Sequence, residues 1–214
     1  HRDLHSFPTR RSSDLFTLER EAIRRDMGLQ DRKLLLSSAG SFGSDVFNDL
    51  ILDAGKLLEK FPELRWIHVS GTEYPIDPES QKKFENIPGL EVYSFRKDMP
   101  QLVTAADLVL SRAGAITLSE NAFTGKAAVL LPSPTVAGDH QRGNARSFSR
   151  VGAAHVIEEA DLHDPVTRAK IFESLERLLL NDQAREEMGR RARTLAREDA
   201  AKRIAQICLK EVGA

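Results

Sequence analysis

Six short apolar runs alternate with helix-like segments along this chain, and the alternation constrains the fold more than any other feature. Each run is short enough for a buried strand, and most of the segments between them carry apolar residues at helical spacing. This alternation is typical of a parallel sheet with helices on both faces. We therefore predict a doubly wound α/β fold with six parallel strands. The predicted strands are Lys33–Ser38, Arg65–Ser70, Leu90–Phe95, Asp107–Leu110, Ala127–Leu131 and Ala153–Ile157.

Helices are predicted between and after these strands. Gly28 marks the end of a short charged helix at the start of the chain, because glycine commonly follows a helix C-terminus. The predicted helices are Leu18–Met27, Asp45–Lys60, one within Pro75–Asn86, Met99–Ala105, Ile116–Phe123, Gln141–Val151, Pro165–Leu180 and one from Gln183 toward the C-terminal end.

Composition narrows the functional classes. The 214 residues carry a net charge of −1, so no basic field favours a nucleic-acid partner. No apolar run approaches the roughly 20 residues that a membrane span needs. The single cysteine, Cys208, excludes an internal disulfide framework, and its helical setting predicts a buried core thiol. The histidines do not pair with other ligands at metal-binding spacing, so no metal site is predicted.

Residues 1–15 differ from the rest of the chain. They read HRDLHSFPTRRSSDL, which is rich in Arg and Ser and has no periodicity. The segment resembles translated sequencing-adapter sequence, and we expect it to be non-native or disordered. The folded domain is therefore predicted to span residues 16–214.

Two turns of small residues are predicted at the carboxyl edge of the sheet. Gly40–Ser44 follows the first strand, and Arg112–Ala115 follows the strand that ends at Leu110. Each leads into a helix, where free backbone N–H groups and the helix dipole favour an anion. Glycines in such turns can also serve only to make a tight strand-to-helix connection. Two anion sites at one crevice suit a diphosphate.

The same turns argue against common nucleotide cofactors. The first turn has Gly40 and Gly43 but lacks the third glycine of a dinucleotide fingerprint. The second strand ends in Ser70 and Gly71, with no acidic residue to hold the ribose of NAD. No Gly-Lys-Ser/Thr sequence follows a glycine loop, so a Walker motif is excluded. We expect no cofactor.

Thr117 and Glu120 share one helix face, because they are three residues apart. One interpretation is a capping box, with Thr117 at the N-cap and Glu120 at the third helical position. The other is that the Glu120 carboxylate accepts hydrogen bonds from a sugar or ribose diol. Spacing alone leaves both interpretations open.

A long polar loop, residues 132–144, follows the fifth strand. Long loops at this edge of a sheet are often functional. His140, Gln141 and Asn144 begin the next helix and can point into the crevice, while Asp139 is the expected N-cap. His140 is a general base by residue type, but no carboxylate partner for it can be identified. No catalytic residue is therefore assigned.

Two segments in this order resemble the C-terminal half of the MurG family of peptidoglycan glycosyltransferases. They are SRAGAITLSE at residues 111–120 and DHQRGNA at residues 139–145. The Gly40–Ser44 turn and the Phe95–Met99 segment are weaker matches, and the resemblance covers the chain from about Phe16 onward. It implies one Rossmann-like half of a two-domain GT-B enzyme. Its missing N-terminal domain would supply most of the acceptor site, the membrane contact and the general base.

The resemblance also implies the reaction. Enzymes of this family transfer N-acetylglucosamine from UDP-N-acetylglucosamine to a lipid-linked muramoyl-pentapeptide, converting lipid I to lipid II with inversion. It further implies a cytoplasmic protein that lies peripherally on the inner face of the bacterial plasma membrane. Two alternatives remain open: a single-domain subunit of another GT-B UDP-N-acetylglucosamine transferase, and a non-catalytic nucleotide-sugar binding module.

By resemblance, the donor site is built from the two turns and the segments beside them. Ser41 and its turn would lie near the diphosphate, and Ile116 and Thr117 would cover uridine and phosphate. The full set of implied donor-binding residues is Gly40, Ser41, Gly43, Arg96, Gly114, Ala115, Ile116, Thr117, Glu120, His140 and Gln141.

The remaining implied roles concern the base and the sugars. The Arg96 backbone would pair with the uracil edge, and Glu120 would hold the ribose diol. Gln141, together with His140, would read the hydroxyls of the transferred sugar. The chain departs from the family pattern at Ala39, where glycine is usual, and at Arg96, where an apolar residue is frequent.

Overall fold

The computed structural model describes residues 19–73, 76–133, 139–157, 162–197 and 199–211. The predicted non-native segment, residues 1–15, lies outside them. The described strands form one six-stranded parallel sheet in the order β3–β2–β1–β4–β5–β6, which confirms the predicted fold class. The strands are β1 (Leu34–Ser38), β2 (Arg65–Val69), β3 (Leu90–Tyr93), β4 (Leu108–Ser111), β5 (Ala128–Leu130) and β6 (Ala154–Val156).

The order of the strands locates the ligand-binding region. β1 pairs with β2 on one side and with β4 on the other, so the sheet grows outward in both directions from β1 and β4. In open parallel sheets, ligands bind beyond the carboxyl ends of the strands at such a reversal of strand order. The ends of β1 and β4, at Ser38 and Ser111, are adjacent in register.

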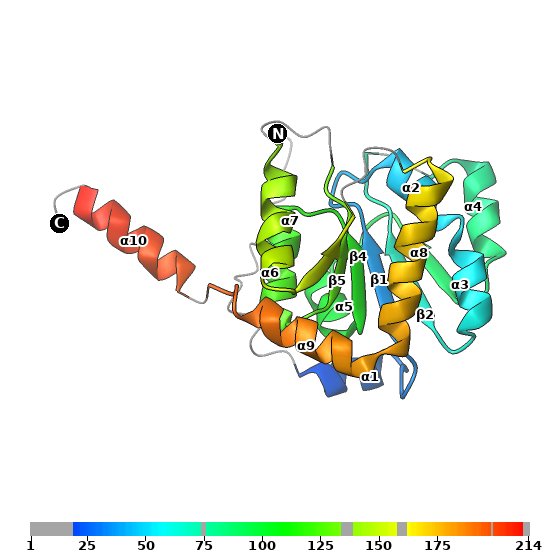
Figure 1. Ribbon diagram of the computed structural model, residues 1–214, viewed down its shortest axis with the longest axis horizontal. Coiled ribbons are helices and arrows are strands. Elements are labelled where there is room, and N and C mark those ends of the chain that lie inside the picture. The colour runs from blue at the N-terminus through cyan, green and yellow to red at the C-terminus, as the bar shows by residue number, and fades with distance from the viewer. Residues whose placement is uncertain (1–18, 74–75, 134–138, 158–161, 198, 212–214) are drawn as a thin grey trace, which may run out of the picture.

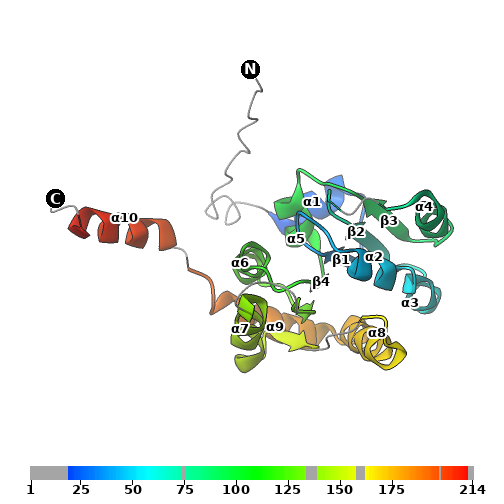
Figure 2. The same cartoon turned by 90° about the horizontal axis from the view of Figure 1, so that it is seen from above.

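Helices cover both faces of this sheet, as Figures 1 and 2 show. Helices α2, α3 and α8 pack on one face, and α1, α5, α6 and α7 pack on the other. The helices are α1 (Arg20–Asp26), α2 (Asp45–Ile51), α3 (Ala54–Lys60), α4 (Pro78–Glu85), α5 (Met99–Ala105), α6 (Ala115–Thr124), α7 (His140–Arg150), α8 (Pro165–Leu180), α9 (Asp182–Arg193) and α10 (Ala200–Glu211).

Alternation of side chains along each strand divides the core into two clusters. In β1, Leu35 belongs to the cluster under α2, α3 and α8, whereas Leu34 and Leu36 belong to the cluster under α5, α6 and α7. All three leucines are buried. Successive side chains of a strand point to opposite faces, so a strand covered on both sides is apolar throughout. This explains why the strands appear in the sequence as continuous apolar runs.

A chain of buried polar groups joins β1, β2 and α2. Trp66 Nε1 donates to Ser37 Oγ at 2.8 Å, Ser37 Oγ lies 2.9 Å from His68 Nδ1, and His68 Nε2 lies 3.0 Å from Asn48 Oδ1. Because indole only donates and an amide oxygen only accepts, the Ser37 hydroxyl donates to Nδ1 and His68 carries its proton on Nε2. Burial lowers the pKa of His68 to about 3, so the imidazole is neutral.

The predicted helix Asp45–Lys60 is wrong in one respect, because two helices occupy this range. Leu52 N–H and Asp53 N–H donate to the carbonyls of Asp49 and Leu50, three residues back, which interrupts the α-helical pattern. The Asp53 carboxylate accepts from Arg168 Nη1 of α8 at 2.7 Å. A contact with a distant helix thus accompanies a break that local periodicity does not reveal.

The single helix predicted from Gln183 onward is also wrong, since α9 and α10 are separate. Thr194 ends α9, and its hydroxyl donates to Arg191 O at 2.7 Å. In Figures 1 and 2, α10 extends away from the body of the molecule. Cys208 lies in α10 and is exposed, so the prediction of a buried core thiol is wrong. The described side chains of α10 are all exposed, so none of them packs into the core.

Candidate functional site

The turn after β1 is a tight loop that packs against the turn after β2. Gly40 and Gly43 have φ values of +96° and +88°, a region that other residues rarely adopt. A side chain on Gly43 would collide with the Ser70 carbonyl in the neighbouring turn after β2. The backbone oxygen of Ser41 accepts from Thr72 N–H at 3.1 Å, which ties the two turns together. Ser41 is left exposed at the carboxyl edge, where the sequence predicted it.

The helix that follows this turn, α2, is capped at its amino end by the Ser44 side chain. Ser44 Oγ accepts from Phe47 N–H at 3.3 Å. One of the first-turn amides of α2 is therefore already satisfied by the protein. Of the two predicted anion sites, this one offers fewer free donors.

The amino end of α6, by contrast, is open. Its N-cap is Gly114, which has no side chain to accept from the first turn. The amides of Ala115, Ile116 and Thr117 donate to no acceptor in the described part of the chain, as expected for the first turn of an uncapped helix. Ile116 is 78% exposed beside them. The turn after β4, where an anion site was predicted, thus leads into three backbone amides without a described acceptor.

The capping-box interpretation of Thr117 and Glu120 is wrong. The helix begins at Ala115, so Thr117 is its third residue and Glu120 lies in the second turn. The Glu120 carboxylate makes no hydrogen bond or ion pair with any described residue, and burial raises its pKa to about 7. It is a partly buried acceptor without a protein donor, which suits the hydroxyl groups of a ligand.

Sequence reasoning missed Arg112, which lies where β1 and β4 diverge. Its Nη1 donates to Leu131 O at 3.1 Å, its Nη2 lies 3.4 Å from Ser44 Oγ, and its guanidinium lies 5.6 Å from the centre of the Phe47 ring. It forms no ion pair with a described carboxylate, and burial lowers its pKa. Arg112 therefore adds a positive charge, not matched by a described carboxylate, between the end of β5 and the start of α2. The only sequence signal for it is a basic residue among small ones.

Arg96 lies just beyond β3, the outer strand of the sheet. Its guanidinium is held by Asp98 and by the ring of Tyr93, so the side chain is turned back onto the protein. The Arg96 backbone N–H and C=O make no hydrogen bond within the described part of the chain. The groups that the resemblance assigns to the base are therefore available.

The start of α7 holds the other predicted sugar-reading residues. Gln141 Oε1 accepts from Ser133 N–H at 2.9 Å, which leaves its amide nitrogen as the donor for a ligand. Asn144 Nδ2 donates to Ala113 O at 3.1 Å and ties α7 to the turn before α6. His140 is the first residue of α7 and is exposed. Residues 134–138 of the predicted loop fall outside the described ranges.

The prediction that Asp139 caps α7 is wrong. Asp139 occupies the N-cap position, but its φ is +51° instead of the extended value that a capping side chain needs, and it makes no cap hydrogen bond. Its carboxylate instead lies 3.6 Å from Arg142 Nη1.

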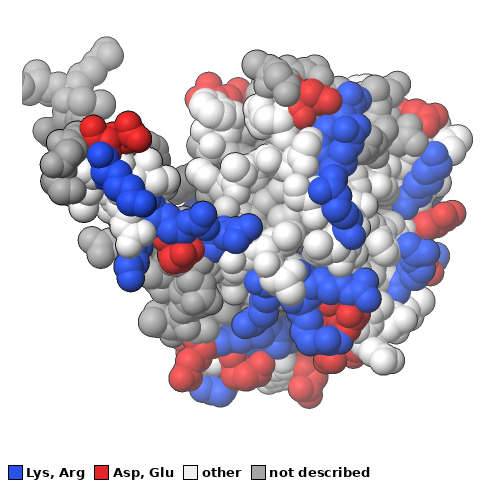
Figure 3. Space-filling view, turned by 60° about the vertical axis from the view of Figure 1, so that its left-hand side comes forward, with Lys and Arg blue, Asp and Glu red and all other residues white. Residues whose placement is uncertain are grey.

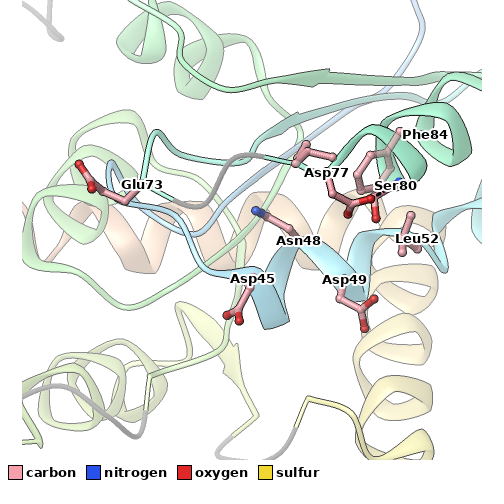
Figure 4. Close-up of a pocket in the computed structure, with 9 residues that line it drawn as sticks. Asp45, Asn48, Asp49, Leu52, Glu73, Asp77, Ser80 and Phe84 are labelled. Carbon is pink, nitrogen blue, oxygen red and sulfur yellow. Dashed lines mark hydrogen bonds between the residues drawn. The ribbon is translucent and has the colours of Figure 1, made fainter.

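A cavity of about 330 Å³ lies beside the first turn, between α2 and α4 (Figure 4). Asp45, Asp49, Glu73 and Asp77 line it, and this acidic lining is unfavourable for a diphosphate. Two of these carboxylates have structural roles, since Asp49 binds Arg168 and Asp77 accepts from the first-turn amides of α4. This cavity therefore does not favour an anion.

The described residues contain neither a candidate metal centre nor a candidate membrane span. No group of three or more His, Cys, Asp or Glu side chains is arranged around a common point as metal ligands. None of the described helices combines the length and apolarity that crossing a bilayer demands.

Comparison with known proteins places these features in a family. Residues 35–204 match the glycosyltransferase family 28 C-terminal domain. A UDP-N-acetylglucosamine–N-acetylmuramyl-(pentapeptide) pyrophosphoryl-undecaprenol N-acetylglucosamine transferase of Salinibacter ruber is 38% identical over 203 residues, which cover 93% of this chain and 52% of the relative. The transferase of the same name in Bacillus subtilis is 31% identical over 196 residues, covering 91% and 53%.

A solved structure gives the same result. The crystal structure of Acinetobacter baumannii MurG superposes with a TM-score of 0.72 at 28% identity, covering 92% of this chain and 55% of that one. The chain thus spans about half the length of the relatives it matches. It belongs to the family of glycosyltransferase family 28 C-terminal domains.

Proposed function

We propose that this chain is the donor-binding half of an inverting glycosyltransferase of peptidoglycan synthesis. The donor is UDP-N-acetylglucosamine, and the acceptor is the lipid-linked muramoyl-pentapeptide, so that lipid I becomes lipid II. The observation that carries the proposal is the open amino end of α6, together with the Glu120 carboxylate in the same helix, to which no described residue donates. Arg112, which precedes α6 and forms no ion pair with a described carboxylate, adds positive charge. The names of the relatives from Salinibacter ruber and Bacillus subtilis support the choice of donor and acceptor.

In this proposal, the diphosphate lies on the amides of Ala115, Ile116 and Thr117. Arg112 stabilises the negative charge of the diphosphate, and Glu120 accepts hydrogen bonds from the ribose diol. The amide nitrogen of Gln141 donates to a sugar hydroxyl. The exposed Ser41 turn forms the opposite wall of the diphosphate site.

The 4-hydroxyl of the muramoyl sugar attacks the anomeric carbon from the face opposite UDP, and the glycosidic C–O bond breaks as the new bond forms. The pair of electrons from the broken bond remains on UDP, so negative charge grows on the diphosphate. Donors that are already in place stabilise such charge without rearrangement. Three amides and one arginine supply the positive potential, so we propose that no cofactor or metal ion takes part. The hydroxyl proton passes to a base in the other half.

We also propose that the enzyme works at a membrane surface together with an N-terminal half. Figure 3 shows Lys and Arg side chains gathered in elongated groups on the α10 side of the molecule. On α7, Arg142, Arg146 and Arg150 recur every fourth residue and so share one helix face. Basic faces of this kind are attracted to anionic lipid headgroups, which supports a peripheral location on the inner face of the plasma membrane.

Calorimetric titration of the 214-residue chain with UDP-N-acetylglucosamine tests the proposal, with UDP-glucose and NAD as controls. We expect binding of UDP-N-acetylglucosamine in preference to both controls. An Arg112→Met variant should bind about tenfold more weakly, the loss of one charge-assisted contact. A folded chain that binds no UDP-sugar contradicts the proposal. Transfer to a lipid acceptor by this chain alone would contradict the assignment of the base to the other half.

A further inference from the structure

We propose that Asp98 and Tyr93 are positioning residues for nucleobase recognition: they hold the Arg96 side chain so that the Arg96 backbone presents a fixed donor and acceptor to the base. The inference rests on the proposed function, because it concerns how the donor's uridine is distinguished from other nucleosides. It follows from contacts of the Arg96 side chain, whereas the base itself would touch only the backbone.

The Arg96 guanidinium is held from two directions. Its Nε donates to Asp98 Oδ1 at 2.8 Å and its Nη2 donates to Asp98 Oδ2 at 2.6 Å, which is a two-point contact. The guanidinium carbon lies 4.6 Å from the centre of the Tyr93 ring, within cation–π range. A two-point ion pair fixes orientation as well as distance. Arg96 therefore has little rotational freedom.

The groups that hold Arg96 are themselves anchored. The Tyr93 hydroxyl donates to Glu91 Oε2 at 2.8 Å, and Arg65 Nη2 donates to the same carboxylate oxygen at 3.0 Å. The Tyr93 carbonyl accepts from Ser70 N–H at 2.9 Å. On the other side, the Asp98 carbonyl accepts from Leu102 N–H at 3.0 Å in the first turn of α5. The contacts thus run from the fixed sheet, through Arg96, to a fixed helix start.

Only residues 94–97, within the segment that joins β3 to α5, lie between the anchors Tyr93 and Asp98. Within the described part of the chain, no backbone hydrogen bond restrains Arg96 in this segment. Its side-chain contacts are consequently the restraints that set the direction of its N–H and C=O. Without them, either peptide group on its two sides could rotate, because few other interactions oppose the change.

A fixed N–H beside a fixed C=O selects between pyrimidines. Uracil offers a carbonyl oxygen next to an N–H, which complements this pair. Cytosine offers an amino group next to an unprotonated nitrogen, the reverse arrangement. A site built to make such hydrogen bonds rejects the wrong partner strongly, since its polar groups would be left unpaired. Restraint of Arg96 therefore predicts discrimination of uridine from cytidine nucleotides.

Calorimetry of the 214-residue chain with UDP and with CDP tests this inference. We expect the unmodified chain to bind UDP more tightly than CDP. Asp98→Ala and Arg96→Met should each weaken UDP binding about fivefold to tenfold and leave CDP binding nearly unchanged, so that the preference narrows by the same factor. Asp98→Asn keeps one acceptor and should fall between. A merely structural role would weaken both nucleotides equally.

Lys97→Ala is the matched control, because Lys97 is an exposed neighbour in the same segment and has no ion pair with a described residue. It should change neither affinity. Thermal unfolding of each variant checks that the fold is retained. UDP binding by the unmodified chain with an unaltered UDP preference in Asp98→Ala and Arg96→Met overturns this inference alone. Absence of UDP binding by the unmodified chain overturns the proposed function and this inference together.

Discussion

The ionisation state of the Glu120 carboxylate should affect both the affinity for the ligand and the free energy of unfolding. Its pKa is raised to about 7 by burial, and no described residue donates to it. If the carboxylate accepts hydrogen bonds from the ribose diol, affinity for UDP-N-acetylglucosamine should fall about tenfold for each pH unit below 7 and level off above about pH 8. Calorimetry between pH 5.5 and 8.5 measures this, and Glu120→Gln should bind weakly with no such dependence.

The same residue makes a prediction about stability that separates it from a helix cap. The folded pKa lies above the unfolded value, so the contribution of Glu120 is most favourable at low pH and is lost as pH rises toward 7. Glu120→Gln should therefore stabilise the free chain at pH 8 by about 1–3 kcal/mol in urea unfolding. Loss of a cap would change stability by about 1 kcal/mol in the opposite direction. Glu85→Gln on exposed α4 serves as the control.

Most of the predicted residues at the carboxyl edge could be found from sequence because their positions follow from local order along the chain. The positions of Gly114 and Glu120 near this edge could be predicted because a strand comes shortly before them in the sequence. Arg112 could not be found in this way, since its role depends on Leu131 and Ser44, which are 19 and 68 residues away. Local spacing suggested a cap at Thr117, but it could not show that the helix starts two residues earlier at Ala115.

Among the elements, the joint between β1, β2 and α2 depends on a neutral His68. Its folded pKa is about 3, below the unfolded value of 6.5, so the unfolded chain takes up a proton first as pH falls. The contribution of neutral His68 to the free energy of unfolding is fully present above about pH 6.5. It falls by about 1.4 kcal/mol per pH unit as the pH is lowered toward 3. Urea unfolding at pH 7 and pH 4.5 should therefore differ by about 2–3 kcal/mol from this residue.

Variants at two histidines separate the contribution of His68 to this pH dependence from that of other groups. His68→Gln cannot take up the proton and should show a smaller loss between the two pH values, although it starts from a lower stability because Ser37 or Asn48 loses a partner. His163→Gln on the surface should retain the full loss. Equal pH dependence of His68→Gln and the unmodified chain would contradict the assignment.

The elements themselves were predictable where one period continued without interruption. Met99–Ala105 and Pro165–Leu180 have the bounds that the apolar pattern indicates. The pattern failed where a tertiary contact decides the outcome. The break between α2 and α3 lies where Arg168 binds Asp49 and Asp53, and a periodicity that continues through both helices hides it.

On the scale of the whole molecule, α10 extends away from the other described elements (Figure 1). Ile204 and Ile207 are 61% and 59% exposed, and they share one face because they are three residues apart. We predict that this face packs against the N-terminal half proposed above. Ile204→Ser with Ile207→Ser should leave the unfolding free energy of this chain within about 0.5 kcal/mol of its original value. Burial of each isoleucine is worth about 1.5–3 kcal/mol, so association should weaken at least tenfold.

Association can be measured by titrating the chain with the separately produced N-terminal half of the Salinibacter ruber relative. Lys202→Ser with Lys210→Ser is the matched control, because it changes two residues on the polar face of the same helix. It should leave association much tighter than the isoleucine pair does. If the isoleucine pair instead lowers the stability of this chain alone, α10 packs on its own domain in solution. In the described structure these isoleucines are exposed and do not pack into a core. We therefore expect their substitution to weaken an interaction only when the other half is present.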